Sequence, residues 1–206
     1  MNTKKTTQKI TQRSTGGITL VETVVAVTIL VAAITGPMTL ASQSLRASRD
    51  ARNELIATHL AEEGVEIVHS VRDNNSATDV SGTHTAWMNT LYPACIKGCG
   101  ADPTDHSVPV WGPNALVGCP AGDCSVVQNL YYNPATGLYK QSANPLSSPW
   151  SITPFKRVIT LQGIDDVGVP VRQVRVTSTV TYSSFSNTPR TVTVVDDLYN
   201  WFPRLN

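Results

Sequence analysis

Four cysteines in the middle of the chain have the residue type and spacing for either metal binding or disulfide chemistry. They form two pairs, Cys95-x3-Cys99 and Cys119-x4-Cys124, and His106 lies between the pairs. The set could hold zinc, but neither pair has the tight two-residue spacing of a zinc knuckle. In an oxidising compartment cysteines of this kind form disulfides. We therefore predict disulfides without metal; three connectivities are possible, and we favour the two local loops, Cys95 with Cys99 and Cys119 with Cys124.

Acidic and histidine side chains suggest two further kinds of metal site. Glu66-x-x-His69 has the spacing of a ligand pair in di-iron carboxylate proteins, but those sites take ligands from four helices and only one helix is evident here. The aspartate pairs at 165–166 and 196–197 could bind calcium, although paired aspartates in turns are usually only solvated. The chain has no Walker A, His-Glu-x-x-His or Gly-x-Ser-x-Gly sequence. We predict neither an enzyme nor a bound cofactor.

Glu22 is notable because it is the only charged residue between Ile18 and Leu45. About twenty apolar residues in a helix cross the hydrocarbon core of a bilayer, so this segment is long enough to span one. A carboxylate inside lipid is costly unless something neutralises it. The alternative is a protonated Glu22, or one at the level of the lipid headgroups. Glu22 is therefore either a paired acid within an apolar assembly or a tolerated acid at the membrane edge.

The charges around the apolar stretch predict its orientation. The first 17 residues contain four basic residues and no acid, which leaves twelve basic and fifteen acidic residues in the remainder. Basic flanks stay in the cytoplasm, so the bulk of the chain is expected outside, with a single pass through the inner membrane. A signal peptide also begins with basic and apolar residues, but no Ala-x-Ala site closes this run, and the run is longer than an ordinary signal core.

The overall charge of the chain argues against a dedicated polyanion binder. The formal net charge is +1, whereas nucleic-acid-binding modules usually carry a basic surplus on one face. Arg46, Arg49 and Arg52 form a short basic row at helical spacing. Such a row is typical of a solvated face or a contact for lipid phosphate. Nucleic acid is not expected as a partner.

The residues around Glu22 resemble the processing site of the bacterial type IV pilin and pseudopilin family. A basic leader ends in Gly17, the hydrophobic Ile18 follows, and Glu22 lies five places after the glycine, ahead of the apolar run 23–30. The match is specific because leader charge, glycine, glutamate position and apolar length must coincide. It covers roughly residues 4–72, about a third of the chain. The family most often has Phe where this chain has Ile18.

The resemblance implies a particular processing and assembly. A prepilin peptidase would cleave between Gly17 and Ile18 and Ile18 would be N-methylated. The apolar helix would then assemble, through an inner-membrane platform, with copies of itself or other pilin-like subunits. Glu22 would neutralise the amino group that cleavage creates on a neighbouring subunit. Pro37, which follows Gly36, should open the helix, so we expect a bend or local melting there, as in the family segment that unwinds in the filament.

The sequence predicts an α+β fold. The expected regions are a leader (1–17), a transmembrane and assembly helix (18–44), an amphipathic continuation (45–75), a loop-rich region with the four cysteines (76–154) and an antiparallel sheet (155–206). In the continuation, apolar residues recur at spacings of three and four, and we assign them to the face that covers the sheet: Leu45, Leu55, Ile56, Leu60, Ile67, Val68 and Val71. Alternating residues predict a meander of three strands at 157–162, 174–181 and 190–195 and a hairpin at 131–139.

Three functional hypotheses follow. The favoured one is a structural pilin or pseudopilin that polymerises through its N-terminal helix into a type IV pilus or a type II secretion-like filament, at the cell surface or in the periplasm. The first alternative is a minor pilin-like subunit that recognises a surface, a secreted substrate or DNA. The second is a membrane-anchored extracytoplasmic metal-binding protein or enzyme.

Overall fold

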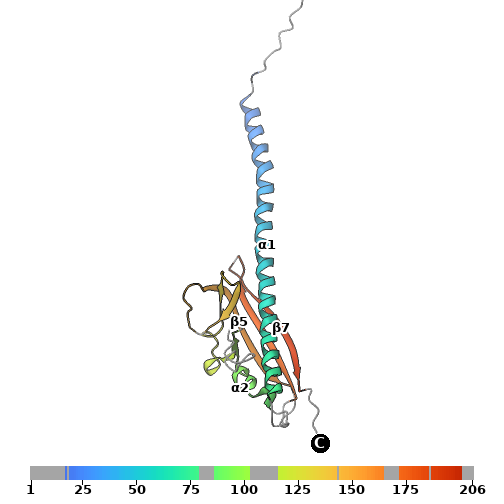
Figure 1. The fold of residues 1–206 in the computed structure, drawn as a ribbon. Helices are drawn as coiled ribbons and strands as arrows, with labels where there is room; N and C mark the ends of the chain where they lie inside the picture. Colours follow the sequence, from blue (N-terminus) through green and yellow to red (C-terminus); the bar gives the residue numbers. More distant parts are fainter. Residues whose placement is uncertain are drawn as a thin grey trace, which may run out of the picture. The chain divides into compact units, whose positions relative to one another are not determined.

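The computed structural model describes residues 17, 19–78, 86–102, 116–142, 144–164, 172–185 and 187–200. The chain divides into two compact units, one up to Arg46 and one from Ala47 onward. The helix α1, Leu20–Ala77, supplies most of the described residues of the first unit and the first element of the second (Figure 1). The remaining elements are η1 (Ala86–Met88), α2 (Leu91–Cys95), β1 (Cys99–Ala101), β2 (Leu116–Gly118), η3 (Pro120–Gly122), β3 (Asn129–Asn133), β4 (Leu138–Gln141), β5 (Ser151–Gly163), β6 (Gln173–Ser183) and β7 (Pro189–Tyr199).

The seven strands within the described part of the chain form one antiparallel sheet organised around the 13-residue strand β5. One edge of β5 pairs with β6, which pairs in turn with β7. The other edge pairs with β3 and with β1. Strand β3 pairs in turn with β4, and β1 pairs with β2. The α+β class is thus confirmed, and the three-strand meander and the β3–β4 hairpin lie where alternation predicted them. The sheet also takes short strands from the region expected to be mainly loops.

One face of the sheet is apolar because side chains alternate between its two faces. Val174, Val176 and Val180 of β6 are buried, as are Ile159 and Leu161 of β5. The second half of α1 lies across this face (Figure 1) and buries a stripe of aliphatic side chains and one glycine: Ala57, Leu60, Ala61, Gly64, Val65, Ile67, Val68 and Val71. The helix and the sheet therefore form the two layers of the core.

The buried stripe of α1 differs in part from the apolar face that the sequence predicts. Leu55 was assigned to that face but is 58% exposed, and Leu45, which lies in the first unit, is 63% exposed. Ala57 and Ala61 lie against the sheet in their place. Small residues let the helix backbone approach the strands closely, so side-chain size as well as hydrophobicity selects the packed face.

Gly64 marks the closest approach between α1 and the sheet. A Cβ added at Gly64 would lie 2.5 Å from Ser178 Oγ and 3.2 Å from both Arg157 Cδ and Ile159 Cδ1. The hydroxyl of Ser178 is buried and has no hydrogen-bond partner among the described residues. The distance between α1 and the sheet at Gly64 is therefore limited mainly by the Ser178 oxygen, which makes no hydrogen bond to offset its burial.

Gly64→Ala is expected to destabilise the chain by about 1–2 kcal/mol, because overpacking outweighs the gain in helix propensity. Ser178→Ala alone should be nearly neutral, since it removes an unsatisfied hydroxyl. The double variant should recover most of the loss, because the Ser178 oxygen is the atom that clashes. A double-mutant cycle of urea unfolding measures this coupling. Additive effects of the two substitutions would show that the close approach is not the cause.

The helix continues without interruption through Pro37. The local melting expected at Gly36-Pro37 is therefore wrong for this structure. A proline clashes with the Cβ of the residue before it, and Gly36 has no Cβ, so this pair is less disruptive than most X-Pro pairs. The Thr39 hydroxyl also donates to the Gly36 carbonyl at 2.8 Å. One missing backbone N–H is not enough to interrupt the helix here.

Candidate functional site

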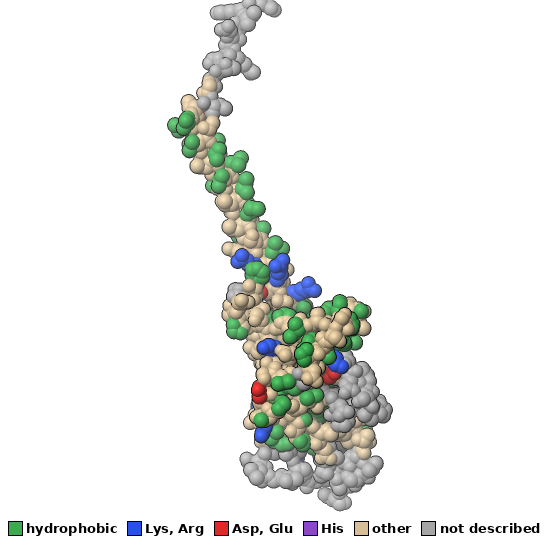
Figure 2. All heavy atoms as spheres, turned by 90° about the vertical axis from the view of Figure 1, so that its left-hand side faces the viewer, with side chains coloured by type: hydrophobic (Ala, Val, Ile, Leu, Met, Phe, Trp, Pro, Cys, Tyr) green, Lys and Arg blue, Asp and Glu red, His purple; other side chains and the backbone are tan. Residues whose placement is uncertain are grey.

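The first candidate site is the apolar segment, residues 20–45 of α1. Every residue of this segment is exposed in the isolated chain. Among the described residues, α1 is the one helix long and apolar enough to cross a membrane. Figure 2 shows hydrophobic side chains along this part of the helix and Lys and Arg side chains gathered where it ends. A helix that is apolar on all sides requires lipid or other helices to cover it.

Five hydroxyl side chains within the apolar segment are satisfied by the helix itself. Four threonines and a serine donate their hydroxyls to carbonyls three or four residues earlier: Thr23 to Leu20, Thr28 to Val25, Thr35 to Ala32, Thr39 to Gly36 and Ser42 to Met38, at 2.8–3.2 Å. In hydrocarbon an unpaired hydroxyl is costly, whereas a hydroxyl bonded to its own helix is tolerated. These residues are therefore compatible with lipid or with a helix bundle around the segment.

Glu22 lies in the first turn of α1 and is exposed. The hydroxyl oxygen of Thr19 accepts the backbone N–H of Glu22 at 3.3 Å, so Thr19 caps the helix. The sequence Thr19-x-x-Glu22 has the form of a capping box. The negative charge of the acid at the third helical position also interacts favourably with the positive end of the helix dipole. The Thr-x-x-Glu pattern signals this role in the sequence, but the role was not among the predictions for Glu22. Glu22 makes no ion pair with the described residues, and Ile18 lies outside them.

The four cysteines form two local disulfides. Cys95 is bonded to Cys99 and Cys119 to Cys124. The Cys119 N–H donates to the Gly98 carbonyl at 2.8 Å, so the two loops lie side by side at the edge of the sheet. Gly98 has a φ of +103° and the sulfurs of Cys124 and Cys119 lie within 3.2 Å of where its Cβ would be, which leaves room only for glycine. The Cys95–Cys99 disulfide joins α2 to β1, and the Cys119–Cys124 disulfide closes the loop that follows β2.

The acidic and histidine residues considered as metal ligands contact protein groups instead. Asp196 Oδ2 lies 2.6 Å from His69 Nε2, which links α1 to β7. Asp197 accepts two hydrogen bonds from Arg175, at 2.9 and 3.1 Å, and this bonding lowers the pKa of Asp197. Glu66 is exposed. No three His, Cys, Asp or Glu side chains gather as a metal site within the described ranges, and residues 106 and 165–166 lie outside them.

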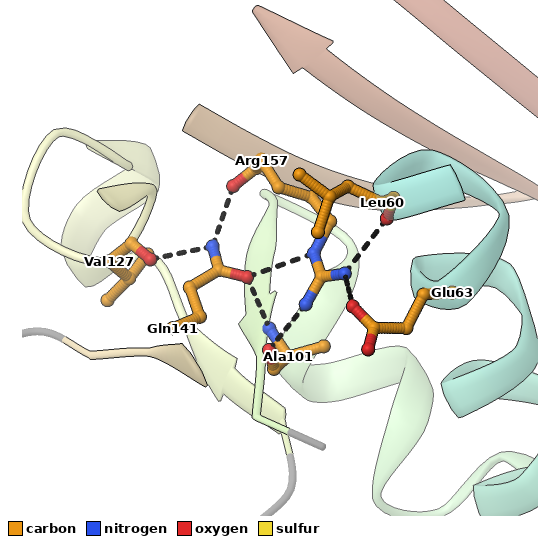
Figure 3. A network of polar contacts seen from close by, with 6 residues as sticks. All are labelled: Leu60, Glu63, Ala101, Val127, Gln141 and Arg157. Carbon is orange, nitrogen blue, oxygen red and sulfur yellow. Dashed lines mark hydrogen bonds and ion pairs between the residues drawn. The ribbon is translucent and has the colours of Figure 1, made fainter. Parts of the chain in front are cut away.

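A buried arginine joins the two layers of the core. Arg157 of β5 is fully buried, and its guanidinium lies between α1 and the sheet (Figure 3). Nη1 donates to the Leu60 carbonyl at 2.9 Å and to Glu63 Oε2 at 2.7 Å, both on α1. Nη2 donates to the Ala101 carbonyl of β1 at 2.7 Å. Burial lowers the pKa of Arg157, and the carboxylate of Glu63 opposes this shift.

Gln141 of β4 completes the same network (Figure 3). Its Oε1 accepts Arg157 Nε at 3.1 Å and the Ala101 N–H at 3.0 Å. Its Nε2 donates to the carbonyls of Val127 and Arg157, both at 2.7 Å. A buried charge is tolerated when its hydrogen bonds are satisfied, and here groups on three elements, α1, β1 and β4, satisfy those of the Arg157 guanidinium. We assign this network to the support of the fold, because its groups bond to one another.

Taken together, a long apolar N-terminal helix, whose second half packs on an antiparallel sheet bearing two disulfides, is a pilin-like architecture. Comparison with protein-family models, curated proteins and solved structures finds no match to this chain. Its function must therefore be argued from its own residues.

Proposed function

We propose that the chain is a structural subunit of the pilin or pseudopilin type, without catalytic activity. The observation that carries this proposal is the division of α1 into two halves with different surroundings. Residues 20–45 expose apolar side chains on all sides, whereas Ala57–Val71 bury a stripe against the sheet. Among the residues that the structure describes, none covers the first half. A second layer, of lipid or of other helices, has to cover it.

Two successive environments meet this requirement. Before assembly, the apolar segment crosses the inner membrane and anchors the sheet-bearing unit outside. After assembly, the same side chains pack against the helices of neighbouring subunits in a filament. The self-satisfied hydroxyls of the segment allow both states, because no hydrogen bond to water is lost in either. The partners we propose are a prepilin peptidase, an inner-membrane assembly platform and further pilin-like subunits.

Processing between Gly17 and Ile18 converts the first state into the second. Removal of the basic leader takes four positive charges from the N-terminus and leaves one new ammonium group on Ile18. Glu22 is four residues from that group in the chain. In a bundle of parallel helices, the carboxylate of one subunit can neutralise the ammonium of the next. Charge neutralisation between copies then favours an ordered stagger of the apolar segments.

We expect the mature chain to begin at Ile18. N-terminal sequencing of protein extracted from membranes of cells with an active prepilin peptidase tests this. Gly17→Val should leave the leader attached, because a branched side chain blocks close approach of the peptidase to the scissile bond. Gly16→Val is the matched control and should be processed. A mature start near residue 45, or an intact Met1 in the unsubstituted chain, would contradict the pilin assignment.

A further inference from the structure

An open groove runs between α1 and the strands β3, β4 and β5. Its volume is about 470 Å³. Arg49, Arg52 and Asn53 line it from α1, and Tyr132 and Tyr139 line it from the hairpin. Apolar side chains, including Ile56 and Phe155, complete the lining. The groove therefore combines two guanidinium groups, phenol and amide donors, and an apolar wall.

The charge of the groove has one sign. Two of its lining residues are basic and none is acidic. Neither Arg49 nor Arg52 forms an ion pair with any described residue, in contrast to Arg157 and Arg175. Arg49 is held by a cation–π contact, with its Cζ 5.8 Å from the centre of the Phe185 ring. The site thus presents positive charge that this part of the chain does not neutralise.

The tyrosines of the groove are suited to donate hydrogen bonds. The rings of Tyr132 and Tyr139 lie 5.0 Å apart, centroid to centroid. Burial raises the pKa of Tyr139, and the opposing effect of Arg52 is smaller. The Tyr139 phenol therefore stays protonated at neutral pH. Protonated phenols and guanidinium groups can both donate to a ligand oxygen, and their hydrogen bonds are strongest when that oxygen is anionic, which favours an anion as the occupant.

The position of the two arginines in the chain indicates where this anion comes from. Arg49 follows the apolar segment by four residues and Arg52 by seven, which is about 6 and 10 Å along a helix. The headgroup layer of a bilayer extends roughly 5–8 Å beyond the hydrocarbon core on each side. When residues 20–45 cross the membrane, Arg49 lies at the level of lipid phosphate. Arg52 lies just beyond that level, and its long side chain can reach back to it.

We propose that the groove binds the phosphodiester headgroup of a net-anionic phospholipid. Arg49 and Arg52 donate charge-assisted hydrogen bonds to the phosphate oxygens, Tyr139 and Asn53 donate to the remaining oxygens, and Ile56 covers the apolar glycerol region. This inference rests on the proposed function, because it requires the apolar segment to be in a membrane. Bound lipid would hold the sheet-bearing unit against the membrane surface before assembly.

Native mass spectrometry tests the site with the full chain, extracted in detergent and supplied with equal amounts of phosphatidylglycerol and phosphatidylcholine. We expect retention of phosphatidylglycerol over phosphatidylcholine by roughly twentyfold, since each juxtamembrane arginine contributes about a factor of five toward an anionic lipid. Arg49→Gln/Arg52→Gln should abolish this preference. Tyr139→Phe should reduce it severalfold while leaving the charge unchanged.

Lys97→Gln/Lys156→Gln is the matched control. It removes the same two charges from exposed positions outside the groove and should retain the preference. An excess of inorganic phosphate should not displace the lipid; complete displacement would identify a free-phosphate site and overturn the proposal. Equal lipid ratios for the unsubstituted chain and the Arg49→Gln/Arg52→Gln variant would also overturn it. A loss of filaments in that variant without any change in lipid retention would assign the groove to a neighbouring subunit instead.

Failure of the lipid-binding groove and failure of the proposed pilin-like function would give different results. If residues 20–45 do not enter a membrane, the unsubstituted chain is extracted without detergent and retains neither lipid. If only the groove assignment fails, the chain needs detergent and retains both lipids without preference.

Discussion

Glu22→Ala is expected to lower the incorporation of the subunit into filaments by more than a hundredfold, while the sheet-bearing unit still folds. The substitution leaves a neighbouring Ile18 ammonium buried without a partner, and breaking a buried ion pair costs about 3–5 kcal/mol. Membrane insertion should become easier, because an acid costs about 2.5–3.5 kcal/mol at the bilayer centre and less near its edge. The measurement is the fraction of subunits in sheared filaments, together with the cleavage state of each variant.

Two further variants separate charge from helix capping, since Glu22 also occupies the third position of the Thr19 capping box. Glu22→Gln keeps a side chain that fits a capping box but cannot neutralise an ammonium group. Its incorporation should be either intermediate between those of the unsubstituted chain and Glu22→Ala or as low as that of Glu22→Ala. Thr19→Ala removes the cap, at a cost of about 0.5–2 kcal/mol, and should still assemble. Normal incorporation of both Glu22 variants, with normal cleavage, would leave Glu22 with only its capping role.

Arg157→Met is expected to destabilise the fold by about 3–5 kcal/mol, the largest effect for any single side chain in the core. The substitution leaves the Glu63 carboxylate and the carbonyls of Leu60 and Ala101 without their donor. The midpoint of urea unfolding of the full chain in detergent should fall by on the order of 2 M, as judged by circular dichroism of the sheet.

The matched control for Arg157 is Arg175→Met, on the opposite face of the sheet. Arg175 pairs with Asp197 in an exposed position, and its loss should leave the unfolding midpoint almost unchanged. Glu63→Gln/Arg157→Met should be less destabilised than Arg157→Met, because both charges are then absent. Equal effects of the Arg157 and Arg175 substitutions would show that the buried network does not join the two layers.

The features that the sequence predicted correctly depend on local periodicity. The alternation of valine with polar residues in 174–181 identified β6 and its buried face, and the turn residues around it identified the meander. The shortest strands were missed because β1 and β2 have three residues each, too few to show a period. Their register depends on pairing with each other and on the contact of β1 with β5, which the sequence does not reveal.

The buried network was not predictable for a different reason. Arg157 occupies the same face of β5 as Ile159 and Leu161, where a charged residue contradicts the apolar pattern. Its partners Glu63 and Gln141 are 94 and 16 residues away in the chain. A buried charge is stable only when such distant groups converge on it, so single-sequence patterns cannot identify one. The groove of Arg49 and Arg52 was predicted only as a basic row, because its tyrosines come from a separate hairpin.

The packing of α1 on the last three strands also imposes an order on biosynthesis. The Leu60 carbonyl bonds to Arg157, which is synthesised 97 residues later, and His69 bonds to Asp196, which is synthesised 127 residues later. The helix therefore leaves the ribosome long before the strands on which it packs have been synthesised. The core can form only after most of the chain has been translated. During this interval Ala57, Ala61 and Gly64 of the buried stripe expose less apolar surface than leucines at the same positions would. The small residues that permit close packing in the finished domain thus also limit aggregation of the nascent chain while it awaits β5, β6 and β7.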